Sequence, residues 1–213
     1  MRFKFYIFIL FFFSNISIGA DWNCSGDGLL RNLQCTSSEG EIFQYEFNES
    51  TNKEGEEGYV EDYEQVGFID FLRQIEPGES IYASTNTEDI LEGVSLGEGR
   101  FKGSAQYSYG DIYEGEKLGI FREGKGKHTT SAYIHEGEFF EGRTTGKGKQ
   151  TSLLYDITYE GDFVDAELDG QGIYTHEWVY GENEKSKGRT VIEGQFKNGQ
   201  THGYAKEITT LIS

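Results

Sequence analysis

The side chains in this sequence that could do chemistry are four histidines, two cysteines and a large excess of carboxylates. The histidines are His128, His135, His176 and His202, and none has a metal-ligand spacing such as His-x-x-x-His. They recur together with a glycine pattern, which predicts exposed strand or turn positions. A histidine site assembled across neighbouring hairpins is the alternative. We therefore predict no metal and no cofactor.

Catalytic motifs are equally absent from the sequence. It contains no Gly-x-Ser-x-Gly elbow, and its Gly-x-Gly triplets lack the helix and the Lys-Ser/Thr of a phosphate cradle. The acidic run 54–62 lacks the spaced ligands of a calcium loop. Carboxylates are numerous enough for a glycosidase-like pair to arise by accident, so an extracellular polysaccharide hydrolase is the least favoured alternative. We predict that the protein is not an enzyme.

The first 20 residues have the layout of a secretory signal. Arg2 and Lys4 precede an apolar run, residues 5–13, and the small residues 17–20 offer a cleavage site after Ala20. An uncleaved anchor is the alternative, but a membrane span takes about 20 apolar residues. We therefore predict an exported protein that is secreted, periplasmic or lumenal.

The region after the signal contains Cys24 and Cys35, the only cysteines. In an exported chain such a pair predicts a disulfide, worth about 3 kcal/mol in the chain-entropy model, that closes the N-terminal end. Asn23 and Asn48 match the N-glycosylation pattern, which has meaning only in a eukaryotic source.

Charge and composition narrow the class of protein. Without residues 1–20 the chain has 17 basic and 37 acidic residues, a net charge of −20. This excess disfavours binding to nucleic acid and to anionic lipid. Gly 29, Tyr 14 and Phe 16 with a single Pro are typical of an all-β protein with many turns.

A glycine pattern recurs four times in one frame. In each unit a glycine precedes a second glycine by nine positions, and a phenylalanine follows the first glycine by two positions in three of the four units. The residues that define the repeat are Tyr113, Gly115, Gly124 and Gly126; Gly137, Phe139, Gly146 and Gly148; Tyr159, Gly161, Phe163, Gly170 and Gly172; and Gly194, Phe196 and Gly203.

The unit can be interpreted as a β-hairpin. The x-Glu-Gly-x-Phe piece alternates like a strand, and Asn198-Gly199 is a strong signal for a two-residue turn. The Gly-x-Gly triplet is expected to leave room for an aromatic ring of a neighbouring unit. Single hairpins are marginal, so stacking of units should supply the stability.

This pattern resembles the MORN repeat family, with units of the form Tyr-x-Gly-x-Phe/Trp-x-x-Gly-x-x-x-Gly-x-Gly. The resemblance covers residues 113–205, and His135 and Ile192 depart from it by replacing Tyr. It implies an elongated single-layer antiparallel sheet of tandem hairpins. It also implies a scaffold for proteins, often at membranes, with any catalytic activity in a separate domain.

The expected organisation has four parts. After the signal, residues 21–47 form a disulfide-closed cap with a degraded repeat, and residues 48–96 form an irregular acidic insertion. A short helix is predicted within 61–75, because apolar residues recur there at helical spacing before Glu76-Pro77-Gly78. Residues 97–213 form the repeat array.

The functional prediction is an exported scaffold or interaction module that binds a protein or polysaccharide through the aromatic face of the array. Residues such as Phe139 and Phe163 are expected to be exposed on that face. A structural envelope or surface protein that self-associates through its edge strands is the alternative.

Overall fold

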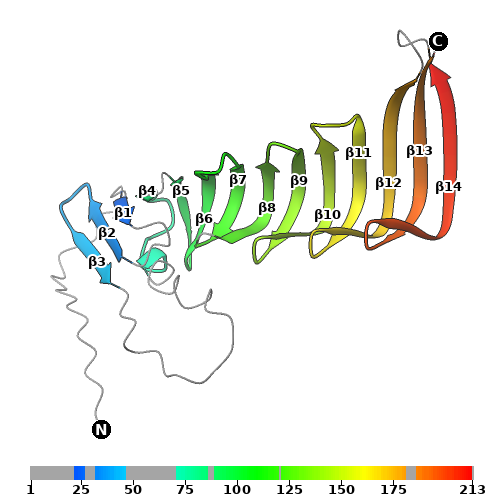
Figure 1. Cartoon of the computed structure of the whole chain (residues 1–213). Helices are drawn as coiled ribbons and strands as arrows, with labels where there is room; N and C mark the ends of the chain where they lie inside the picture. The colour runs from blue at the N-terminus through cyan, green and yellow to red at the C-terminus, as the bar shows by residue number, and fades with distance from the viewer. Residues whose placement is uncertain are drawn as a thin grey trace, which may run out of the picture. The chain divides into compact units, whose positions relative to one another are not determined.

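The computed structural model describes most of the chain after residue 21, namely residues 22–26, 32–46, 71–85, 89–119, 121–180 and 186–212. The expected signal, residues 1–20, lies outside this part. The chain divides into two compact units, residues 1–99 and 100–213. Each is described by itself below, and both are built from β-strands (Figure 1).

The first unit is a five-stranded sheet in the order β3-β2-β1-β4-β5. Its strands are β1 (Trp22–Gly26), β2 (Asn32–Ser37), β3 (Ile42–Glu46), β4 (Ser80–Thr85) and β5 (Ile90–Gly97). Neighbours pair antiparallel except β1 and β4, which are parallel. The expectation that residues 48–96 are irregular is therefore wrong for β4 and β5, which are regular strands of this sheet.

Cys24 and Cys35 are directly opposite each other in the β1–β2 hairpin, and they form the predicted disulfide. Both are buried. The bond therefore joins neighbouring strands in the interior of the first unit. Asn23 is exposed on β1, whereas Asn48 lies outside the described residues.

The helix predicted within residues 61–75 is only a turn in its described part, residues 71–75. Residues 61–70 lie outside the described part, and Phe71 and Leu72 are helical before the chain turns. The amide of Gln74 donates to the carbonyl of Phe71. Phe71 is buried against Trp22, with ring centroids 5.1 Å apart, and against Phe43, at 4.6 Å. The apolar stripe thus packs on the sheet.

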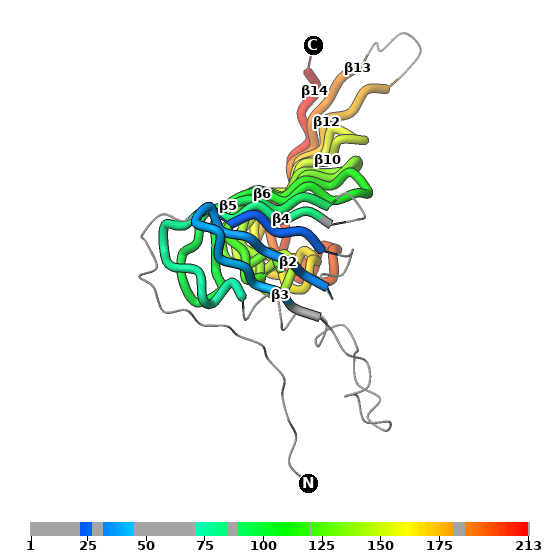
Figure 2. The backbone as a smooth tube through the Cα atoms, turned by 90° about the vertical axis from the view of Figure 1, so that its left-hand side faces the viewer, coloured from blue at the N-terminus to red at the C-terminus, as the bar shows by residue number. Residues whose placement is uncertain are grey.

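The second unit is one open layer of nine strands, each antiparallel to the next (Figure 1). The strands are β6 (Arg100–Gln106), β7 (Ile112–Leu118), β8 (Phe121–Thr129), β9 (Tyr133–Phe140), β10 (Arg143–Ser152), β11 (Ile157–Val164), β12 (Glu167–Tyr180), β13 (Ser186–Lys197) and β14 (Gln200–Ile212). The strands lie one behind another in Figure 2. This confirms the predicted all-β sheet of hairpin repeats.

Two-residue turns join the strands at one end of the hairpins. Both turn residues have positive φ, at Glu141 (48°) and Gly142 (80°), and likewise at Asn198 and Gly199. This is the geometry that matches the twist of paired strands, and it confirms the turn predicted at Asn198-Gly199. The second turn residue also donates its amide to the preceding unit, as Gly142 does to the carbonyl of Arg122.

Candidate functional site

A row of glycines crosses the second unit, one in each strand from β6 to β13. They are directly opposite one another in the registers of successive strand pairs. The row consists of Gly103, Gly115, Gly126, Gly137, Gly148, Gly161, Gly172 and Gly194, and Ala205 continues it in β14. The first glycine of each unit and the last glycine of each Gly-x-Gly triplet therefore meet in space, which their sequence spacing alone did not show.

The second glycine of each Gly-x-Gly triplet has an aromatic ring against it. A Cβ on Gly126 would overlap the ring of Tyr113, and a Cβ on Gly172 would overlap the ring of Tyr159. Each ring belongs to the same hairpin as its glycine. The expectation that a ring of a neighbouring unit needs this space is therefore wrong.

The first glycine of the triplet has a different role. Gly124 and Gly146 have φ of 63° and 59°, in the left-handed region that glycine tolerates. The carboxylate of Glu116 lies where a side chain at position 124 would be, and the carboxylate of Glu138 lies where a side chain at position 146 would be.

The third unit uses an acid in the same way. Asp162 accepts a hydrogen bond of 2.8 Å from the amide of Gln171. Glu116, Glu138 and Asp162 each follow the first glycine of their unit directly in the sequence. An acid at this fixed position is the sequence signal for the contact, and the glycine spacing alone did not indicate it.

The repeat aromatics form a ladder of edge-to-face contacts on one side of the sheet, here called the inner face. Phe139 is 5.2 Å from Tyr113 and 5.4 Å from His135 between ring centroids. Phe163 in turn is 4.6 Å from His135 and 5.2 Å from Tyr159. Each phenylalanine thus bridges two successive units, which is the packing that holds the array together.

This packing corrects the expected binding face. Phe139, Phe163 and Phe196 have exposed fractions of 3%, 1% and 5%. They are core residues of the array and offer no surface to a partner. The functional prediction of an exposed stripe made from these aromatics is therefore wrong.

The histidines are also placed differently from the prediction. His135 is fully buried because it occupies the ring position that Tyr113 and Tyr159 fill in other units, and His128 is buried beside it. His176 is half-buried, and only His202 matches the expected exposure. Within the described residues no three His, Cys, Asp or Glu side chains cluster as metal ligands would.

His135 lacks a hydrogen bond that the equivalent tyrosines make. The hydroxyl of Tyr113 donates to the carbonyl of Glu116 at 2.8 Å, and that of Tyr159 donates to the carbonyl of Asp162 at 3.4 Å. Both ring nitrogens of His135 lack a hydrogen-bond partner among the described residues. Burial, together with the nearby charges of His128 and Arg122, lowers the pKa of His135 from 6.5 to about 4.

Lys117 is the second unusual residue of the inner face. It takes the place of the repeat phenylalanine, and it is fully buried. Its Nζ lies 5.2 Å from the ring centroid of Tyr113 and 5.7 Å from that of Phe101, and it has no hydrogen-bond partner among the described residues. Burial, and to a lesser extent the charge of Arg122, lowers the pKa of Lys117 from 10.5 to about 7.

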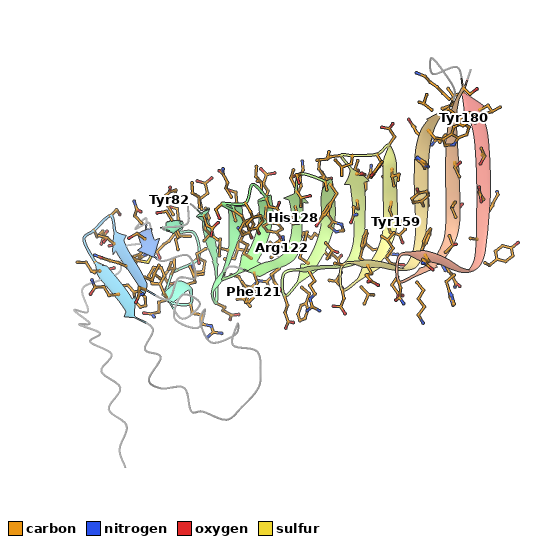
Figure 3. All side chains as sticks on the ribbon, viewed as in Figure 1. Tyr82, Phe121, Arg122, His128, Tyr159 and Tyr180 are labelled. Atoms are coloured by element: carbon orange, nitrogen blue, oxygen red, sulfur yellow. A yellow bond between two sulfur atoms is a disulfide. The ribbon has the colours of Figure 1, made fainter. Side chains whose placement is uncertain are left out.

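His128 connects these residues to the adjacent polar groups. Its Nε2 is 2.9 Å from Oδ2 of Asp111 and 2.9 Å from a guanidinium nitrogen of Arg122, which lies beside it on β8 (Figure 3). Burial and Arg122 lower the pKa of His128, and Asp111 opposes this shift. The contact of His128 with Asp111, the residue that precedes β7, ties the start of β7 to β8 on the inner face, which is a structural role.

The opposite side of the sheet, here called the outer face, carries charges that alternate from strand to strand. Opposed residues in one row are Glu114, Lys127, Glu136, Lys149, Glu160, Ile173, Glu193 and Lys206. Lys127 and Glu136 form an ion pair of 3.6 Å. The alternation in this row fails at Ile173, which is 43% exposed between Glu160 and Glu193.

A second row beside the first has the same alternation. Lys102 is opposite Glu116, Lys125 is opposite Glu138, Lys147 is opposite Asp162 and Gln171 is opposite Gln195. Between these four pairs the register shifts at bulges. Lys147 pairs with Asp162. The alternation stops at β12 in this row too, because Gln171 is neutral. Strand β12 therefore lacks both cations that the pattern would place there.

The comparisons with known proteins agree with the hairpin geometry. The family model of the MORN repeat matches residues 113–131, 135–152, 159–178 and 193–209. These four segments of the chain are therefore MORN repeats. MORN repeats are generally non-catalytic modules that interact with proteins or membranes. No curated protein gives a significant match to the sequence.

No helix among the described residues is long and apolar enough to cross a membrane.

Proposed function

We propose that this protein is an exported, non-enzymatic scaffold that binds a protein partner through the outer face of strands β11–β13. The observation that carries the proposal is the missing cation on β12, at Ile173. The inner-face aromatics are used in packing, whereas the outer face is open to solvent. A MORN repeat array with such a face is suited to interaction.

The partner that fits this surface is a basic protein segment. Glu160 and Glu193 lie on strands two apart, about 10 Å from each other by ordinary strand spacing. A lysine or arginine side chain of a partner would reach the position between them. Its aliphatic stem would cover the exposed side chain of Ile173 while its charge completes the alternation.

The chain's overall charge supports the same choice of partner. With the signal removed the net charge is −20, which attracts basic proteins and repels nucleic acid and anionic lipid. A polysaccharide would be expected to use exposed aromatic rings. The rings that recur in the repeats are buried, so a basic protein is favoured over a polysaccharide.

The test is site-specific photocrosslinking. A photoreactive residue at position 173 is exposed to the native envelope and medium fractions, and crosslinked species are identified by mass spectrometry. The control places the same residue at Lys127, where the row of charges is complete. We expect position 173 alone to capture one partner, at a segment rich in Lys or Arg.

A competing variant makes the result decisive. Ile173→Lys supplies the missing cation from within the chain, so it should abolish capture in a pull-down while the fold stays intact. Capture that survives Ile173→Lys would refute the proposed surface. Recovery of only self-crosslinks would favour the alternative, a self-associating structural protein.

One observation favours that alternative. Strand β14 pairs with β13 on one edge, and no other described strand lies on its second edge. Its Tyr204 and Leu211 are 90% and 72% exposed. An unpaired edge of this length can add a strand from another chain.

A further inference from the structure

Four basic side chains gather on the inner face of β7, β8 and β9. Lys117 is directly opposite Arg122, and His128 is directly opposite His135. Among the described residues, the carboxylate bound to this group is that of Asp111, at 2.9 Å from His128. Three of the four bases are buried, in a protein whose overall charge is strongly negative.

The equivalent positions in the third repeat hold neutral residues. Tyr159 stands where His135 stands in the second, and Phe163 stands where Lys117 stands in the first. Tyr159 has its hydroxyl bonded to a carbonyl, whereas neither nitrogen of His135 has a partner among the described residues. The neutral imidazole is tolerated in this site, but an imidazolium would have two buried donors without acceptors.

The surroundings of His135 offer little to stabilise a positive charge. Its ring lies edge-to-face with Phe139 and Phe163 and against Gly148, whose Cβ would be 2.8 Å from Nε2. The titratable and charged groups that face this core from the packed elements are Asp111, Tyr113, Lys117, Arg122, His128, Tyr133 and Tyr159. Tyr107, Glu116 and Glu123 act on Tyr113 from outside the core. The groups that act electrostatically on His135 are both basic, namely His128 and Arg122.

We propose that His135 is an acid-sensitive joint of the array: its protonation loosens the packing between the second and third repeats. The joint is local because the contact that breaks is the edge of His135 against Phe163. Farther along, Tyr159, Phe163 and Phe196 form a cluster with Leu168, Tyr174 and Ile192 that contains no histidine. Mild acid therefore loosens β9 at its contact with Phe163 of β11 before it disturbs the cluster on β11–β13.

The consequence for binding follows from the arrangement of the two faces. His135 lies on β9, between Ile134 and Glu136, and Glu136 belongs to the outer charge row. Loosening of β9 would break the Lys127–Glu136–Lys149 part of that row while leaving Ile173 in place. The array would then bend at one defined joint. This inference does not depend on the proposed partner surface.

Hydrogen exchange read by mass spectrometry at pH 7.5 and pH 5.0 tests the joint. After correction for intrinsic exchange, amides of residues 133–140 in the parent should exchange roughly tenfold or more faster at pH 5.0. Amides of residues 187–197 are the internal control and should change little. In His135→Tyr, which restores the side chain of the other repeats, the acid effect should disappear.

A second variant and a direct titration of the parent keep the test valid if His135→Tyr does not fold. His135→Phe tests the same substitution without a hydroxyl, and an NMR titration of the imidazole protons in the parent follows His135 itself. The proposal is overturned if His135→Tyr or His135→Phe keeps the acid effect in residues 133–140. It is also overturned if His135 titrates near pH 6.5 without a change in exchange.

Discussion

The ring of Tyr159 occupies the space that a side chain on Gly172 would need, one strand away in the same hairpin. A tyrosine ring at position 159 therefore requires a glycine at position 172, because the ring can lie flat on the sheet only where the opposing strand has no Cβ. The same relationship holds for Tyr113 with Gly126 and for His135 with Gly148. It explains why the last position of each of these Gly-x-Gly triplets is a glycine.

Replacement of Gly172 by Val should destabilise the protein by about 3 kcal/mol, because the ring of Tyr159 must leave its place. The cause is overlap, since Gly172 has an ordinary φ. Urea unfolding followed by circular dichroism measures the effect. Gly199→Ala is the control, because a Cβ there meets nothing within 4 Å and only the φ of 74° opposes it. Equal losses in both variants would contradict the role of the ring.

Replacement of Ala166 by glycine should raise the stability of the fold. It is the second residue of a turn with Asp165, and its φ of 67° is in the region that L-residues avoid at a cost of about 1 kcal/mol. The hydrogen bond that its backbone amide donates to the carbonyl of Thr144 would be kept. Ala166→Gly is therefore expected to raise the free energy of unfolding by up to about 1 kcal/mol. A melting temperature below that of the parent would show that the turn relaxes in another way.

Lys117→Phe should stabilise the first repeat, because it restores the side chain of the other units and removes a buried amine. The parent should also gain stability with rising pH. The unfolded chain keeps the proton of this lysine up to its pKa of 10.5, whereas the folded chain releases it near 7. Between pH 7 and pH 9 this linkage amounts to about 2 kcal/mol.

The measurement is urea unfolding of both proteins at pH 7 and pH 9. The difference in stability between variant and parent should shrink as the pH rises, since only the parent has the titrating amine. Lys125→Phe, on the outer face, is the control and should show no such trend. A constant difference at both pH values would mean that Lys117 is not buried as a free amine.

Ile173→Lys should stabilise the fold by up to about 1 kcal/mol, because it places a cation directly opposite Glu160 and Glu193. Ile173→Glu is the matched reversal and should destabilise by a similar amount. Both effects should diminish in high salt, which screens exposed charges. Thermal unfolding at low and high ionic strength checks the order of the three proteins.

Much of the architecture could be predicted because it depends on local rules. The turn at Asn198-Gly199, the disulfide and the succession of hairpins each follow from residue type and spacing over short stretches of chain. The strands β4 and β5 were missed because β4 pairs with a partner distant in sequence, in parallel with β1. The exposed aromatic face was predicted wrongly because alternation along a strand does not say which side another unit will cover.

The sequence by itself determined the hairpin unit and its four MORN-like repeats within residues 113–205, since glycine and turn residues restrict the backbone locally. Only the tertiary structure decided which rings are buried, since each phenylalanine is covered by rings of two successive units. It also decided that His135 and Lys117 have no hydrogen-bond partner among the described residues, and that the outer charges alternate up to Ile173. Those facts depend on strand register, which brings together residues of different hairpins, such as Tyr113 and Phe139.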